Sequence, residues 1–125
     1  VWQIQDLMLR ANLETVLAKL SDLLTVSKVP PILARFAMID LARKLHGVGA
    51  GFASGTPQAA LDSNLKLWGP GKTSVIAAAR KADPAVLADL LRDSVEADLA
   101  AKSGGTTDEV RSIERLAVRF ASVLN

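Results

Sequence analysis

Residues 67–74 read LWGPGKTS, and the Gly-Lys-Thr within them is the combination that holds phosphate in P-loop proteins. The complete motif has a first glycine five positions before Gly71, and Lys66 stands there instead. A P-loop also follows a buried parallel strand, whereas LDSNLKLW has polar residues at alternate positions. We therefore expect Gly69 and Pro70 to separate two helices, KTSVIAAARKA to begin the second, and no nucleotide to bind.

Few other side chains are suited to catalysis or to metal binding. The chain has no Cys, which excludes disulfides, thiolate zinc sites and a Cys nucleophile. Its single His, His46, is too little for a multi-histidine metal site. We expect no catalytic residue, no metal and no cofactor. The absence of Cys and of any long apolar run fits a cytoplasmic chain without a membrane span.

Positive charge gathers in the middle of the chain, where residues 28–82 carry eight Lys or Arg against two Asp. Trp68 falls in the predicted turn between Lys66 and Lys72, and Arg80 follows on the next helix. A turn-exposed indole can stack on an unpaired base while neighbouring cations hold the phosphate backbone. Lys66, Trp68, Lys72 and Arg80 are therefore candidate DNA contacts; the alternative is that the indole joins two helices.

The elements that would position these residues are helices. Ala and Leu make up 39 of the 125 residues, and no segment alternates with period two, so we expect one all-α bundle of six to seven helices. Four helix starts carry capping residues, namely Asn12, Thr56 with Pro57, Asp83 with Pro84, and Thr106 with Glu109.

The third helix is predicted from the two prolines at 30–31 to Leu45, and the glycine-rich HGVGAGFASG is predicted to end it. This stretch is not a dinucleotide loop, because Ser54 replaces the third glycine of G-x-G-x-x-G and a helix precedes it. We interpret it as a mobile connection between helices. The predicted inward face of the third helix is Ile32, Leu33, Phe36, Ile39 and Leu45.

The remaining apolar stripes follow helical spacing. They are Leu13, Val16, Leu17, Leu20, Leu23 and Leu24 on the second helix; Leu87, Leu90, Leu91, Val95 and Leu99 on the sixth; and Val110, Ile113, Leu116, Phe120 and Val123 on the last. On the solvent side of the sixth helix, Arg92 is predicted to pair with Glu96, and Asp98 with Lys102.

Residues 87–120, LADLLRDSVEADLAAKSGGTTDEVRSIERLAVRF, resemble the last two helices of the delta subunit of the bacterial clamp loader, part of the DNA polymerase III holoenzyme. The residues that match are Ala97-Asp98, Lys102, Gly104, Ile113-Glu114 and Leu116. Ser94 departs from the family pattern, which has Leu there. Upstream, VWQIQDLMLRANLETVLAKLSDLL looks like the passage that joins the AAA+-like portion to the C-terminal domain, and PPILARFAMIDLARKL resembles the family's Pro-then-helix segment.

The resemblance implies that residues 1–125 form a C-terminal helical collar domain, which assembles with the gamma/tau and delta prime subunits into a pentameric loader. The sliding clamp would be contacted by an AAA+-like portion outside this chain, and primed DNA by the assembled loader. The delta subunit does not hydrolyse ATP. The alternatives are the collar of gamma/tau or delta prime, a stand-alone DNA-binding helical module and, third, an ATP-binding enzyme.

The apolar fraction also suggests an assembly role. Half of the residues are apolar and the mean hydropathy is +0.25, more than a core of this size readily hides. We expect spare apolar surface on the third helix and the last two helices, from residues such as Met38, Leu41, Leu90 and Val118.

Overall fold

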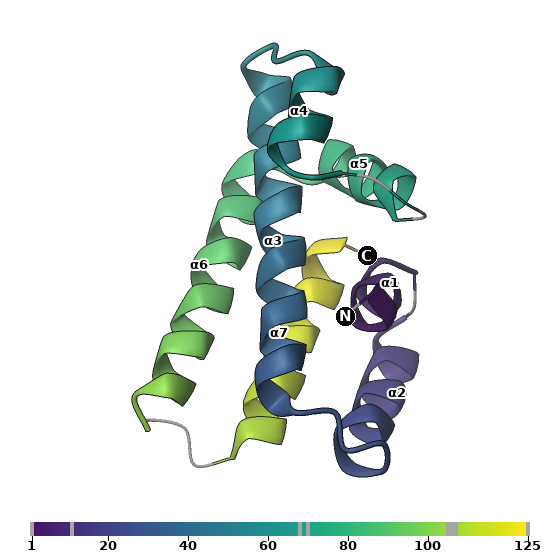
Figure 1. The fold of residues 1–125 in the computed structure, drawn as a ribbon, viewed down its shortest axis with the longest axis vertical. Helices are drawn as coiled ribbons and strands as arrows, with labels where there is room; N and C mark the ends of the chain where they lie inside the picture. The colour runs from purple at the N-terminus through teal and green to yellow at the C-terminus, as the bar shows by residue number, and fades with distance from the viewer. Residues whose placement is uncertain (1, 11, 68, 70, 105–107, 125) are drawn as a thin grey trace.

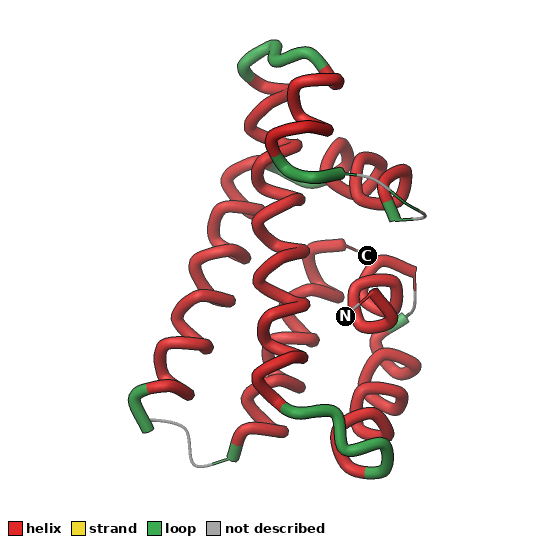
Figure 2. The backbone as a smooth tube through the Cα atoms, viewed as in Figure 1, coloured by secondary structure: helices red, strands yellow, loops and turns green. Residues whose placement is uncertain are grey.

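Helix α3 is the axis of the molecule, and it contacts α1, α4, α5, α6 and α7 (Figure 1). The computed structural model describes residues 2–10, 12–67, 69, 71–104 and 108–124, and within these ranges it contains seven helices and no strand (Figure 2). The helices are α1 Trp2–Arg10, α2 Leu13–Thr25, α3 Pro31–Ala53, α4 Gln58–Asn64, α5 Lys72–Lys81, α6 Pro84–Lys102 and α7 Glu109–Leu124. The prediction of an all-α bundle is confirmed.

Local capping starts several of these helices where the sequence predicts. The Asn12 side chain accepts a hydrogen bond from the Thr15 amide at 2.9 Å, and Asp83 accepts one from the Ala85 amide at 2.9 Å. The start of α4 is one residue later than predicted, since Pro57 rather than Thr56 occupies the N-cap position. At α7 the cap is Asp108, which accepts from the Arg111 amide at 3.0 Å; Thr106 of the predicted capping box lies outside the described residues.

Most of the glycine-rich stretch, up to Ala53, is helical, which corrects the predicted end of α3. Gly47, Gly49 and Gly51 lie inside the helix, and α3 ends only at Ala53. Each glycine faces a leucine: a Cβ at Gly47 would lie 2.6 Å from Leu65 Cδ2, a Cβ at Gly49 3.0 Å from Leu87 Cδ1, and one at Gly51 would collide with Leu61. The absent side chains allow close packing of α4 and α6, and that packing outweighs the low helix propensity of glycine.

The predicted inward face of α3 is wrong at its N-terminal end. Ile32, Leu33 and Phe36 are 52%, 47% and 58% exposed. The buried face carries three alanines together with larger apolar residues, namely Ala34, Ala37, Met38, Leu41, Ala42, Leu45 and Val48. Alanine in three of these positions lets neighbouring helices approach closely, which favours this face over the one with bulkier side chains.

Helices α6 and α7 complete the core. Leu87 and Leu90 of α6 are buried as predicted, but Val95 and Leu99 are 40% and 60% exposed. The predicted stripe of α7 is confirmed, with Ile113, Leu116 and Phe120 buried and Val110 and Val123 packed against them. The stripe of α2 is also confirmed, except that Leu13 is exposed.

Ser94 is buried among apolar residues where the resembled family has Leu. Its hydroxyl donates to the Leu90 carbonyl oxygen one turn earlier at 2.8 Å, so the polar atom is satisfied within α6. The turn that contains it therefore packs into the core without an unpaired donor.

Candidate functional site

Lys72 of the Gly-Lys-Thr sequence is held in an ion pair. It is the first residue of α5, and its Nζ lies 2.6 Å from Asp62 Oδ2 of α4. Gln58 Nε2 donates to the other carboxylate oxygen at 2.7 Å. The hydrogen bonds from Lys72 and then Gln58 hold the pKa of Asp62 below its ordinary value of 3.8. Helix α4, not a strand, precedes the turn. The charge of Lys72 is paired with Asp62, and this ion pair joins α4 to α5.

Lys66 lies in the connection between α4 and α5. It is exposed and has a φ of 56°, a left-handed conformation that is uncommon for a residue other than glycine. Gly69, in the same connection, has a φ of 81°. Trp68, the aromatic member of the candidate DNA contacts, lies outside the described residues, so its predicted stacking role stays a prediction.

Arg80 stacks on an aromatic ring of α3. Its guanidinium carbon lies 4.7 Å from the centroid of the Phe52 ring, an arrangement in which cation and ring attract each other. This pair borders an open hollow of about 470 Å³ between α3 and the α5–α6 junction. At the other end of α5, Ser74 accepts a weak hydrogen bond of 3.4 Å from Arg10 of α1.

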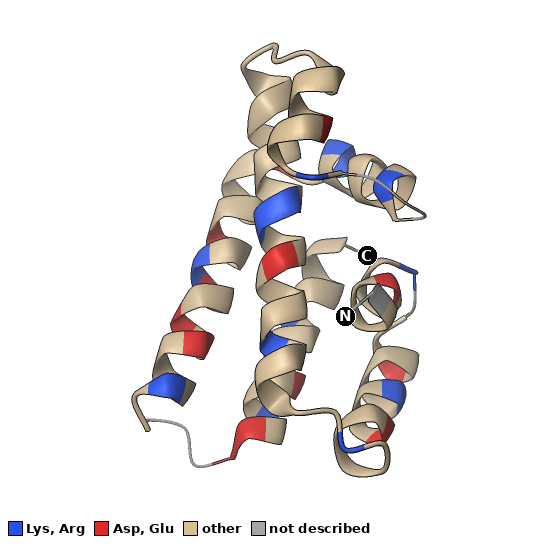
Figure 3. Cartoon of the chain, viewed as in Figure 1, with Lys and Arg blue, Asp and Glu red and all other residues tan. Residues whose placement is uncertain are grey.

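The structure does not bring Lys72 and Arg80, two of the candidate DNA contacts, together. Lys72 and Arg80 are eight residues apart on α5, roughly 12 Å along the helix axis, and each contacts a different neighbour. In Figure 3 blue marks the two ends of α5, which begins at Lys72 and ends with Arg80 and Lys81. The exposed side chains of Lys66 and Arg80 are available to an anionic partner.

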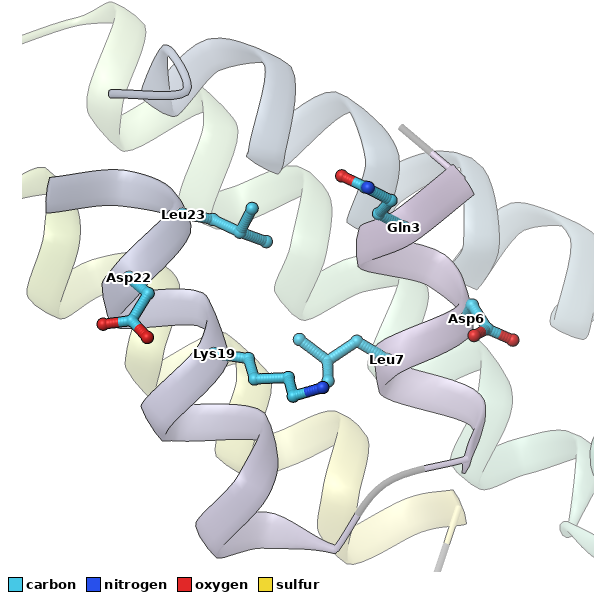
Figure 4. A pocket seen from close by; sticks show the side chains of 6 residues that line it. All are labelled: Gln3, Asp6, Leu7, Lys19, Asp22 and Leu23. Carbon is cyan, nitrogen blue, oxygen red and sulfur yellow. The ribbon is translucent and has the colours of Figure 1, made fainter. Parts of the chain in front are cut away.

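A shallow groove lies between α1 and α2 (Figure 4). It encloses about 360 Å³, with Leu7 and Leu23 in its wall and the Lys19 side chain reaching toward Leu7. The Asp6 carboxylate at its edge is paired with Arg10 at 2.6 Å. These side chains could contact an apolar ligand, but the groove is open to solvent and lacks converging buried polar groups.

Two classes of site are not visible in the described ranges. Among those residues, no three His, Cys, Asp or Glu side chains come together as metal ligands would. Each helix described there is either too short or too polar to cross a lipid bilayer.

Arg35 is a structural feature that the sequence reading missed. Its side chain is only 6% exposed, and it contacts Asp98 of α6 at 3.3 Å and Glu109 of α7 at 3.4 Å. Lys102 approaches the other oxygen of Asp98 at 2.7 Å, which confirms the predicted pair of Asp98 and Lys102. The hydrogen bond from Lys102, followed by that from Arg35, holds the pKa of Asp98 below its ordinary value despite partial burial.

The predicted pair of Arg92 and Glu96 is replaced by Arg92 with Asp89 at 3.2 Å. The predicted spare apolar surface is also different. Met38, Leu41 and Leu90 are fully buried, which corrects that prediction, whereas Val118 is 41% exposed. Within the described residues, the large apolar side chains left exposed are Leu13, Val26, Ile32, Leu33, Phe36, Val86, Val95, Leu99 and Val118.

Comparison of the chain with protein-family models, with curated proteins and with solved structures finds no match in any of the three.

Proposed function

We propose that this domain assembles with other protein subunits through its helix faces, as the C-terminal collar domain of a clamp-loader delta subunit. The observation that carries the proposal is the exposed apolar surface on α3 and α6, where Ile32, Phe36 and Leu99 are each more than half exposed. The core is complete without them. Apolar side chains grouped on the surface of a helical domain favour a protein partner.

The residues of the resemblance to delta subunits have structural roles that support this identity. Asp98 and Lys102 pair at the end of α6, and Gly104 follows the helix with a φ of 78°, the usual conformation of a glycine that ends a helix. Ile113 and Leu116 lie in the core of the bundle. In this proposal, the last two helices hold the domain together and leave their outer faces to neighbouring subunits.

A contact with primed DNA is a secondary part of the proposal. Residues 63–82 contain Lys66, Lys72, Arg80 and Lys81 and no acidic residue. The ion pair of Lys72 with Asp62 lowers the net charge of this side, so α5 would assist in DNA binding and not carry it alone. A stand-alone DNA-binding module, in contrast, would bind duplex without partner subunits.

Mixing the domain with purified gamma/tau and delta prime subunits tests the proposal. We expect the domain to co-elute with them in size-exclusion chromatography, because buried apolar contacts persist at moderate salt. Elution of the domain apart from the other subunits would contradict the proposal. Salt-sensitive binding to duplex DNA in the absence of partners would instead favour the stand-alone DNA-binding module.

A further inference from the structure

Helix α4 is held to the bundle by little apolar packing. Its one buried residue is Leu61, and this leucine is not part of the apolar core that the other helices share. The Leu61 side chain instead fills the space that Gly51 of α3 leaves free. Figure 1 shows α4 beside the C-terminal part of α3, away from α2 and α7. The core would therefore keep all its members if α4 moved away from α3.

Left-handed backbone conformations border α4 on both sides. Gly55, which precedes the helix, has a φ of 75°, and Lys66, two residues after its end, has a φ of 56°. For lysine this conformation is strained, because its Cβ crowds the backbone. Leu67 follows directly and is 4% exposed in the core, so it anchors the chain beyond Lys66. The chain can therefore turn at Gly55 and Lys66 while α3 and Leu67 stay in place.

One ion pair fastens α4 to α5. Lys72 Nζ lies 2.6 Å from Asp62 Oδ2, and the two side chains are 38% and 24% exposed. An ion pair that is open to solvent weakens when salt screens the charges. Helix α5 is itself fixed by Val75 and Ala79, which are buried in the core. The pair thus ties a weakly packed helix to a firmly packed one, with a strength that depends on salt.

The packed position of α4 also buries a polar atom that has no partner. Gln58 Nε2 donates to Asp62 Oδ1 at 2.7 Å, whereas Gln58 Oε1 is buried and accepts no hydrogen bond from the described residues. A buried acceptor without a donor destabilises the state that buries it, and solvent satisfies the atom once it is exposed. This amide and the strained Lys66 therefore both oppose the packing of α4.

We infer that residues 56–65 form a strap that opens as one unit, with Gly55 and Lys66 as its hinges. The ion pair of Lys72 with Asp62 is the latch of this strap. The other helices keep the core closed, so opening is a local event that requires less free energy than global unfolding. Salt favours the open state because it weakens the latch.

Opening of the strap changes two surfaces of the molecule. It separates Lys72 from its carboxylate, in a stretch where residues 63–82 contain no acidic residue. It also removes Leu61 from the notch at Gly51 and uncovers that side of α3. The strap opens in the isolated domain, whether or not other subunits bind to it. It is therefore a device by which ionic conditions change the charge that α5 presents.

Hydrogen exchange followed by NMR spectroscopy measures this opening at single amides. The amides of Ala60, Leu61 and Leu65 donate hydrogen bonds inside the strap, and they should exchange at similar rates, faster than the amides of α3 that lie in the core. An increase in NaCl from about 20 mM to about 500 mM should speed their exchange about three- to fivefold. The amides of α6 and α7 in the same sample should change much less.

Removal of the latch charge should replace the effect of salt. We expect Asp62→Asn to speed exchange of the strap amides about threefold or more at low salt, and to make that exchange insensitive to NaCl. Asp22→Asn is the matched control. It removes a carboxylate at an exposed position of α2 and should leave exchange in the strap as it is in the wild type.

Two results would overturn the inference. The first is exchange of the strap amides at the rate of the core, or at a rate that neither salt nor Asp62→Asn changes. The second is a different salt response at each of Ala60, Leu61 and Leu65, because residues that fray separately do not form one unit.

Discussion

At the scale of single residues, Arg35 has the largest structural role among the charged side chains described above. A buried guanidinium can present N–H donors in two directions, and here it contacts carboxylates on two different helices. It thereby fixes the end of α6 and the start of α7 relative to α3.

Replacement of Arg35 should destabilise the whole bundle. We expect Arg35→Ala to lower the free energy of unfolding by about 3 kcal/mol, because two carboxylates lose their shared cation and a cavity forms. Arg35→Lys should retain part of the stability that Arg35→Ala loses. It should not retain all of it, because one ammonium group cannot reach both carboxylates in the geometry of the guanidinium. Urea denaturation measures the difference.

The control is Arg111→Ala, at an exposed position on α7, which should change stability by less than about 0.5 kcal/mol. Equal effects of Arg35→Ala and Arg111→Ala would show that the buried ion pairs do not hold the three helices together.

The carboxylates of Asp40 in α3 and Asp98 in α6 predict a loss of stability in acid. Burial alone raises the pKa of Asp40, but hydrogen bonds from Lys44, Gln5 and Arg43 leave it below 3.8; Asp98 is lowered mainly by Lys102. A pKa that is lower in the folded state means that the unfolded chain binds more protons as the pH falls. The stabilisation is therefore complete above the unfolded pKa and is lost as the pH falls through the folded pKa.

We expect the urea midpoint to be level near pH 6 and to fall below about pH 4. Asp98→Asn should be less stable than wild type at pH 6 but should lose less of its remaining stability in acid. A variant that follows the wild-type pH profile in parallel would show that Asp98 does not contribute to the acid dependence.

At the scale of elements, the glycines of α3 determine how α4 is placed. Leu61 of α4 packs where Gly51 has no side chain, and Leu65, the residue that follows α4, packs where Gly47 has none. The ion pair of Lys72 with Asp62 joins this helix to α5. Helix α4 is short, so these contacts and not its own propensity maintain it.

Gly51→Ala should loosen α4 selectively. The added methyl group gains about 1 kcal/mol of helix propensity in α3 but displaces Leu61, at a cost of about 1–3 kcal/mol. We expect a small net change in global stability, together with roughly tenfold faster hydrogen exchange in residues 58–64.

Ala50→Gly provides the opposite case, because Ala50 is exposed on the same helix. It should lower global stability by about 1 kcal/mol without changing exchange in α4 relative to the rest of the bundle. If Gly51→Ala leaves exchange in α4 unchanged, the close approach at Gly51 is not what holds that helix.

The sequence predicted the elements whose signals are local. Asn12 and Asp83 mark helix starts because a short polar side chain satisfies a free backbone amide. The α7 stripe was predicted because its apolar and polar positions separate cleanly around the helix.

The sequence could not predict features that depend on tertiary packing. In the N-terminal half of α3, both faces carry apolar residues. The face that contains alanine is the buried one, because it allows closer helix packing than the face with Ile32 and Phe36. The low helix propensity of glycine led to a predicted end of α3 that is too early. The leucines that pack against Gly47, Gly49 and Gly51 come from other segments, so the sequence of α3 alone does not reveal them. The burial of Arg35 could not be predicted for the same reason, because its partners lie more than sixty residues away in the sequence.

At the scale of the whole molecule, the bundle has a complete core, and apolar side chains of α3 and α6, including Ile32, Phe36 and Leu99, stay exposed. This combination is typical of a domain that is stable in itself and also binds a neighbour. The proposed collar role assigns the exposed apolar side chains of α3 and α6 to a subunit contact and gives α5 a supporting part in binding DNA.

The central claim is best tested by sedimentation velocity of the domain with the gamma/tau and delta prime subunits, at a salt concentration that suppresses non-specific charge pairing. The account predicts that wild-type domain moves with the larger complex, that Val26→Glu does the same, and that Phe36→Glu sediments alone as a folded monomer. Sedimentation of the wild-type domain as a separate species in that mixture would contradict the account.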